Sequence, residues 1–151
     1  MKTLVAGCGN VFLGDDGFGV EVARKLAGTD LPDGVQVRDA GIRGVHLAYE
    51  LLDGWDLVVL VDASPRGGAP GTLYVIEPDV PEVAAPLVDA HGMSPDAVLG
   101  ALRTLGGEVG RVLVVGCEPA DVSEGMGLSL AVEGAVDEAV QMVRQLIDGR
   151  T

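Results

Sequence analysis

The chain has 151 residues, of which 48% are hydrophobic and only 3% aromatic, and it contains 23 glycines. This length fits one domain, residues 1–151, with a core built from Val, Leu and Ala. The net charge of −13 argues against a nucleic acid or an anionic membrane as partner, because both require a basic face.

Five short apolar runs, rich in β-branched residues, predict strands at residues 2–6, 35–39, 56–62, 71–77 and 110–116. Helical patterns follow at residues 17–27, 45–52, 95–105 and 130–147. Ser94 and Ser129 stand where a hydroxyl would cap the third and fourth of these helices. No run approaches the roughly 20 apolar residues of a membrane span. Cys8 and Cys117 are too few for a disulfide framework, which indicates reduced thiols and a cytoplasmic protein.

Strands that alternate with helices predict an α/β fold with three layers, in which helices cover both faces of a twisted, mostly parallel, five-stranded sheet. The fourth strand should be the exception. Only "ASPRGGAPG" separates it from the third strand, and a parallel crossover needs a dozen or more residues. We therefore expect this strand to run antiparallel, with the segment "PDVPEVAAPLVDAHGM" leading back to the next helix.

The stretch "GCGNVFLGDDGFG", residues 7–19, looks like a glycine-rich nucleotide loop but differs from one in two respects. Phe12 occupies the position of the third glycine in the dinucleotide fingerprint. Asp15 and Asp16 stand where a phosphate would lie and would repel it. This turn is suited to a cation.

Ligands of open α/β sheets bind beyond the carboxyl ends of the parallel strands. Asp15 and Asp16 after the first strand, Asp62 at the end of the third, and His91 on the return segment should meet there. Carboxylates with an imidazole suit a metal such as Mn, Ni or Zn. Simpler interpretations stay open: one of the adjacent acids caps the following helix, Asp62 is a strand-end turn residue, and His91 is an ordinary loop histidine.

The motifs "GCGNVFLGDDGFG", "VVLVDA", "HGMSP" and "GCEPADVSEGMGLS", in this order, resemble those of the hydrogenase maturation proteases. These endopeptidases trim the carboxyl terminus of the large subunit of NiFe hydrogenases, and their fold is a twisted sheet between helix layers. The resemblance implies that Asp16, Asp62 and His91 contact the metal and carry catalysis. It also implies that nickel arrives with the precursor of the large subunit, and that no organic cofactor is needed.

The implied enzyme is a cytoplasmic, monomeric, aspartic-type endopeptidase in which a carboxylate or the metal activates water. No serine lies in a G-x-S-x-G motif, which argues against an acyl-enzyme. The resemblance makes Asn10 a turn residue that faces substrate and places Arg43 in a substrate-contacting loop. That loop departs from the family, which tends to have a Gly-Thr turn where this chain has Ile42 and Arg43.

Two other functions stay open: a nickel-binding chaperone without hydrolytic activity, and a hydrolase of small substrates on the same fold. Several residues have two interpretations as well. Cys8 and Cys117 are small buried residues or soft metal ligands, and Glu118 is a candidate for a further metal ligand. His46 is expected on the surface, whereas Arg66 either binds a substrate carboxylate or is solvated.

Overall fold

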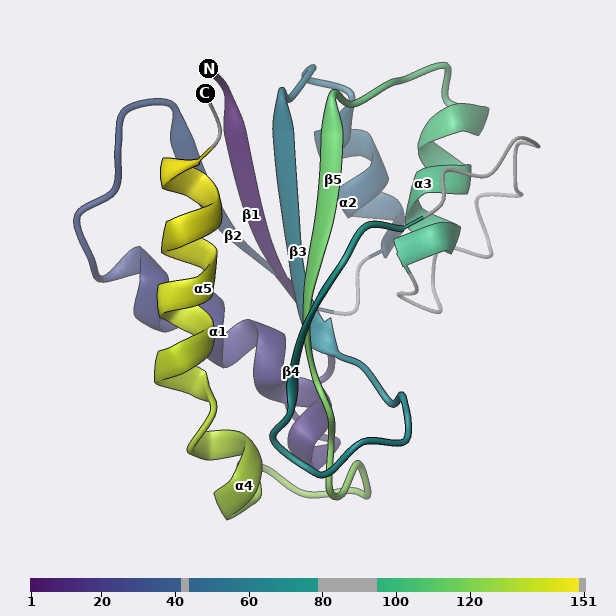
Figure 1. Cartoon of the computed structure of the whole chain (residues 1–151). Coiled ribbons are helices and arrows are strands. Elements are labelled where there is room, and N and C mark those ends of the chain that lie inside the picture. Colours follow the sequence, from purple (N-terminus) through teal and green to yellow (C-terminus); the bar gives the residue numbers. More distant parts are fainter. Residues whose placement is uncertain (42–43, 79–94, 150–151) are drawn as a thin grey trace.

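A five-stranded sheet with the strand order β2-β1-β3-β5-β4 forms the middle of the protein (Figure 1). The computed structural model describes residues 1–41, 44–78 and 95–149. The strands are β1 (Thr3–Cys8), β2 (Val35–Gly41), β3 (Leu57–Ala63), β4 (Leu73–Ile76) and β5 (Arg111–Cys117). The helices are the 3-10 turn η1 (Gly14–Gly17), α1 (Phe18–Ala27), α2 (Gly44–Leu51), α3 (Pro95–Thr104), α4 (Leu130–Glu133) and α5 (Val136–Asp148).

The three central strands are parallel to one another and almost entirely buried. Their near-continuous apolar sequences follow from this position, because helices cover both faces of the sheet. β4 lies at the edge and pairs antiparallel with β5, with Leu73 opposite Cys117. The prediction that the fourth strand runs antiparallel, made from the short link before it, is therefore confirmed.

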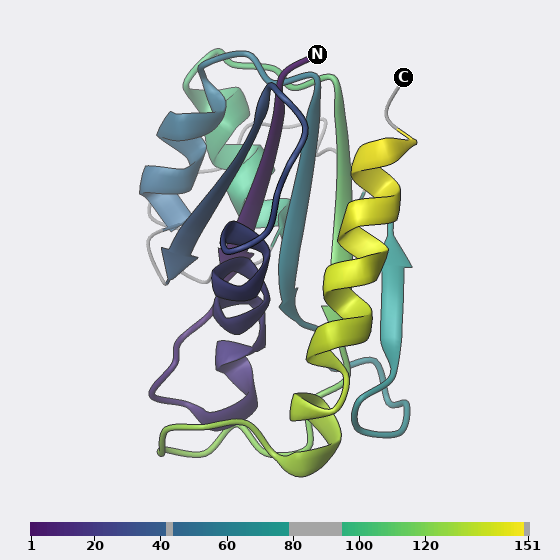
Figure 2. The same ribbon diagram turned by 90° about the vertical axis from the view of Figure 1, so that its left-hand side faces the viewer.

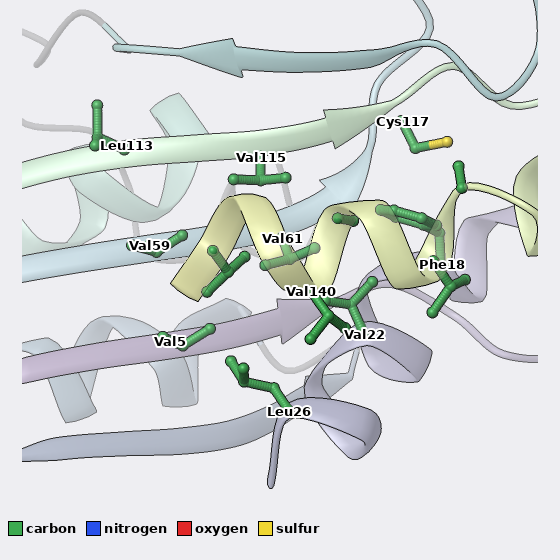
Figure 3. Close-up of a cluster of buried hydrophobic side chains, with 14 of the residues drawn as sticks. Val5, Phe18, Val22, Leu26, Val59, Val61, Leu113, Val115, Cys117 and Val140 are labelled. Carbon is green, nitrogen blue, oxygen red and sulfur yellow. The ribbon is translucent and has the colours of Figure 1, made fainter. Parts of the chain in front are cut away.

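Two hydrophobic clusters, one on each face of the sheet, join the sheet to its two helix layers. One face packs against α1 and α5, and its central side chains include Val61 and Val115 from the sheet and Phe18 and Val140 from the helices (Figure 3). The other face packs against α2 and α3. Figure 2 shows α1 and α5 on one side of the sheet and α2 and α3 on the other. The predicted α/β fold with three layers is confirmed.

The prediction of one helix over residues 130–147 is wrong. α4 ends at Glu133 with Gly134 as its C-cap, and α5 begins at Val136. Ser129 caps α4 as predicted, since its side-chain oxygen accepts a hydrogen bond from the backbone N–H of Val132 at 3.4 Å. The other predicted helices agree with α1, α2 and α3 to within one residue. Ser94 lies outside the described residues.

Within the described ranges, no helix has both the length and the apolar character that crossing a membrane requires.

Candidate active site

The loops that follow the carboxyl ends of the parallel strands lie together at one end of the sheet, the lower end in Figure 1. Residues 9–17 follow β1, Asp62 lies near the end of β3, and residues 118–129 follow β5. The 3-10 turn η1, which carries Asp15 and Asp16, contacts β3. The acids in the turn after β1 and the acid near the end of β3 therefore lie at the same end of the sheet, as predicted.

Two glycines allow α1 to lie directly against the end of the sheet. A Cβ atom on Gly19 would lie 2.0 Å from the carbonyl oxygen of Val61, and one on Gly7 would lie 2.2 Å from the carbonyl oxygen of Gly19. Only a residue without a side chain permits such an approach between backbones. The start of α1, and with it the turn that contains Asp16, is thereby held next to the end of β3.

Asp16 closes the turn that carries it. Its Oδ2 accepts a hydrogen bond from the backbone N–H of Asn10 at 2.8 Å. Gly9 has a φ of 134°, and a Cβ atom there would lie 1.8 Å from the carbonyl oxygen of Asp16. Asn10 has the turn-forming role predicted for it, since its Oδ1 accepts a hydrogen bond from the N–H of Phe12 at 2.9 Å.

Asp62 is partly buried, and its Oδ1 accepts a hydrogen bond from the N–H of Ala63 at 2.8 Å. Burial and, to a smaller extent, the negative charge of Asp16 together raise the pKa of Asp62 from 3.8 to about 8. The bond from Ala63 offsets only part of this effect. Two carboxylates held together in this way favour a shared proton or a cation.

The structure places two of the three predicted metal ligands. His91 lies outside the described residues, as does the predicted substrate contact Arg43. Among the residues that the structure does describe, no three His, Cys, Asp or Glu side chains form a group that could hold a metal ion. The described chain thus supplies the Asp16–Asp62 pair, and the complete set of three ligands stays a prediction.

Asp15 faces away from this pair and into the protein. It is fully buried, and its carboxylate accepts hydrogen bonds from the backbone N–H groups of Ala120, Asp121 and Ser129 and from the Ser129 hydroxyl. Burial alone would raise the pKa of Asp15, but these bonds outweigh it and hold the pKa below its usual value. The helix-cap interpretation is wrong, because no side chain caps η1 or α1.

Glu118 organises the link between β3 and β4. It is 5% exposed, and its Oε1 accepts hydrogen bonds of 2.8 Å from the N–H groups of Arg66 and Gly68 and from the Tyr74 hydroxyl. Burial opposes its charge, yet these bonds lower the pKa of Glu118. Glu118 therefore has a structural role. Sequence patterns gave no signal for it, because its partners lie more than 40 positions away.

The two cysteines are small buried residues on opposite faces of the sheet. Cys8 belongs to the cluster beneath α2 and α3, and Cys117 to the cluster beneath α1 and α5. Burial raises the pKa of both thiols, helped by Asp62 and Asp39 at Cys8 and by Asp15 and Glu118 at Cys117. The pKa of Cys117 is about 11. Protonated thiols are poor metal ligands and poor nucleophiles.

The remaining candidate residues, His46 and Arg66, add little to the site at the carboxyl ends of the strands. His46 is exposed on α2, as expected. The guanidinium carbon of Arg66 lies 5.8 Å from the centre of the Tyr74 ring, so the side chain stacks within the link that Glu118 organises.

Apolar side chains are exposed on the loops of the same edge. We call them the apolar rim: Phe12 (63% exposed), Val122 (49%), Met126 (74%) and Leu130 (89%). Backbone hydrogen bonds join the two loops that carry most of them, from Gly14 N–H to Gly125 O and from Gly125 N–H to Phe12 O, both at 2.9 Å. A hollow of about 360 Å³ lies between these loops and α1, lined in part by Val11 and Met126.

Comparisons with known proteins agree on one family. Residues 20–146 match the family model described as hydrogenase maturation protease. The chain is 33% identical to a hydrogenase expression/formation protein of Rhodobacter capsulatus, over 96% of this chain and 71% of that protein. It is 29% identical to the hydrogenase 2 maturation protease of Escherichia coli, over 95% of this chain and 88% of that one. The structure of a hydrogenase maturating endopeptidase from E. coli superposes with a TM-score of 0.83 at 30% identity, covering 99% of this chain and 93% of the other.

Proposed function

The chain belongs to the hydrogenase maturation protease family, and on this premise we propose that it removes the carboxyl-terminal extension of the large-subunit precursor of a NiFe hydrogenase. Members of this family are peptidases. The observation that carries the proposal for this chain is the Asp16–Asp62 pair at an open sheet edge. We expect a monomer that acts in the cytoplasm.

Nickel enters this proposal as part of the substrate. Asp16, Asp62 and His91 recognise the nickel that the precursor already holds. The raised pKa of Asp62 supports this role, because a site that retains a proton at neutral pH binds free metal weakly. A resident catalytic zinc is normally secured by several histidines or thiolates and by a second layer of hydrogen bonds. A weak, acidic site engages only a metal that its partner presents.

Hydrolysis then proceeds without a covalent intermediate. One of the carboxylates, or the substrate's nickel, activates a water molecule against the scissile carbonyl. Because its pKa is about 8, Asp62 must first lose its own proton before it can serve as this base, and binding to the substrate's nickel favours that loss. Both cysteines are buried and protonated, which argues against a thiol nucleophile.

The apolar rim supports a protein substrate over a small molecule. Exposed apolar side chains on neighbouring loops are typical of surfaces that bind another protein. Asn10 and Arg43 are the proposed polar contacts to the precursor. Among the described residues, none accepts a hydrogen bond from the side-chain nitrogen of Asn10, and we propose that this nitrogen donates to the precursor.

Incubation with nickel-loaded precursor, followed by mass spectrometry of the precursor, tests the proposal. Wild-type protein should shorten the precursor, whereas Asp16→Asn, Asp62→Asn and His91→Ala should each remain folded and lose most of the activity. Asp53→Asn, an exposed acid in the turn after α2, is the matched control and should cut normally. If wild-type protein changes the nickel content of the precursor while the precursor polypeptide keeps its full length, the protein is a chaperone instead.

A further inference from the structure

Asp15 and Asp16 are adjacent in the chain but serve different parts of the molecule. Asp16 accepts a hydrogen bond from Asn10 and interacts with Asp62. All four hydrogen bonds to the Asp15 carboxylate come from residues 120–129, more than 100 positions away. The turn η1 therefore presents one acid at the site and buries the next one as an anchor.

Asp15 both donates a hydrogen bond to the loop after β5 and accepts hydrogen bonds from it. The backbone N–H of Asp15 donates to the carbonyl oxygen of Asp121 at 2.9 Å, while Asp15 Oδ2 accepts from the N–H of Asp121 at 3.0 Å. Gly14 and Gly125 are joined by a further backbone hydrogen bond of 2.9 Å next to this pair. The loop after β1 and the loop after β5 thus form one hydrogen-bonded unit.

Ser129 connects this unit to the hydrophobic core. Its N–H and hydroxyl donate to Asp15 at 2.7 and 2.9 Å, and its oxygen also caps α4. Val132 of α4 is fully buried in the cluster beneath α1 and α5. The position of η1 is therefore fixed by the core through α4, and not only by its neighbours in the chain.

We infer that Asp15 is a positioning residue of the active site, which sets the place of the Asp16 carboxylate relative to Asp62 by tying η1 to residues 120–129. The inference rests on the proposed function. Asp15 does not touch the substrate in this scheme. It acts through Asp16, which follows it directly in η1.

Asp15→Asn is the sharpest perturbation of this anchor. An asparagine side chain has the same shape, but its NH₂ group must face at least one of the N–H donors that Asp15 binds, because both carboxylate oxygens accept from backbone N–H groups. The two loops must then separate. A displacement of about 1 Å in a catalytic group costs about 100-fold in rate.

Two measurements separate positioning from stability alone. The first is processing of nickel-loaded precursor. The kcat of Asp15→Asn should fall about 100-fold, and its KM should rise by a factor at least about ten times smaller than that. The second needs no substrate: hydrogen exchange of the Asn10 amide, whose partner is Asp16 Oδ2, should accelerate together with that of Asp121 and Ser129.

The control is Ile147→Val or Val143→Ala, whichever matches the urea midpoint of Asp15→Asn. Both residues are buried on α5, away from the anchor, and the chosen variant should process at the wild-type rate with unchanged exchange at Asn10. If Asp15→Asn does not fold, Gly14→Ala replaces it. A Cβ atom there would lie 2.6 Å from the carbonyl oxygen of Asp121 and would force the same two loops apart.

Asp15→Asn or Gly14→Ala with the kcat and Asn10 exchange of the control would overturn the inference while leaving the proposed function intact. Failure of wild type to cut the precursor would instead refute the proposed function. The exchange measurement would still decide whether Asp15 holds Asp16 in place.

Discussion

Removing the charge of Asp62 should make the protein more stable at alkaline pH. Asp62→Asn keeps an oxygen that can accept the hydrogen bond from Ala63, so the variant changes charge more than shape. The native carboxyl group has a pKa of about 8, raised by burial and then by Asp16, whereas in the unfolded chain it ionises near 3.8. Ionised Asp62 is therefore tolerated better by the unfolded chain than by the folded one.

The sign and the size of the effect follow from proton binding. Between about pH 4 and pH 8 the native protein holds a proton on Asp62 that the unfolded chain has lost, so the free energy of unfolding falls as pH rises and levels off above about pH 8. At about 1.4 kcal/mol for each pH unit, the ceiling is about 6 kcal/mol. Because Asp62 is only partly buried, we expect about 3 kcal/mol.

Urea unfolding at several pH values, followed by the fluorescence of Trp55, measures this difference. Trp55 is the only tryptophan and is 3% exposed, so it reports loss of the core. The stability of Asp62→Asn relative to wild type should increase from about pH 4 to about pH 9, while Asp53→Asn should give a constant difference. A constant difference for Asp62→Asn as well would show that the folded environment does not oppose its charge.

Three further substitutions test the architecture and the substrate surface. Gly19→Ala places a methyl group 2.0 and 2.5 Å from two backbone oxygens and should lower the urea midpoint by an amount equivalent to about 3 kcal/mol, whereas Gly28→Ala, with its nearest atom at 3.5 Å, should change stability little. Glu118→Gln replaces a buried carboxylate that accepts three hydrogen bonds and should cost about 1–3 kcal/mol in the same measurement. Phe12→Ala should raise KM for the precursor about tenfold with kcat unchanged, and an equal effect from the exposed Tyr49→Ala on α2 would contradict a specific role for the apolar rim.

Local patterns were sufficient to predict the elements of the fold. The buried strands have continuous apolar runs, and the short link before β4 leaves no room for a parallel crossover, so both the sheet and its antiparallel strand could be predicted. The break between α4 and α5 could not. Val132 and Val136 both face the same core cluster, so the apolar spacing continues across Gly134 although the helix does not.

The site was predicted less completely, because its details depend on contacts between distant residues. The residue pattern identified a pair of adjacent acids, and the family resemblance selected Asp16 for the site, but neither predicted that Asp15 is buried and bonded to a distant loop. This arrangement depends on Ala120, Asp121 and Ser129, which lie 105 to 114 positions from Asp15. The burial of Cys8 and Cys117 on opposite faces is likewise a consequence of how the strands pack.

Comparison of nickel-loaded and nickel-free precursor tests the central claim most directly. The two forms of one precursor, with the same sequence, are incubated with wild-type protein, and the mass of the product is measured over time. If the Asp16–Asp62 pair recognises nickel that the substrate carries, only the loaded form should lose its carboxyl-terminal extension. Equal cutting of the two forms would contradict the account.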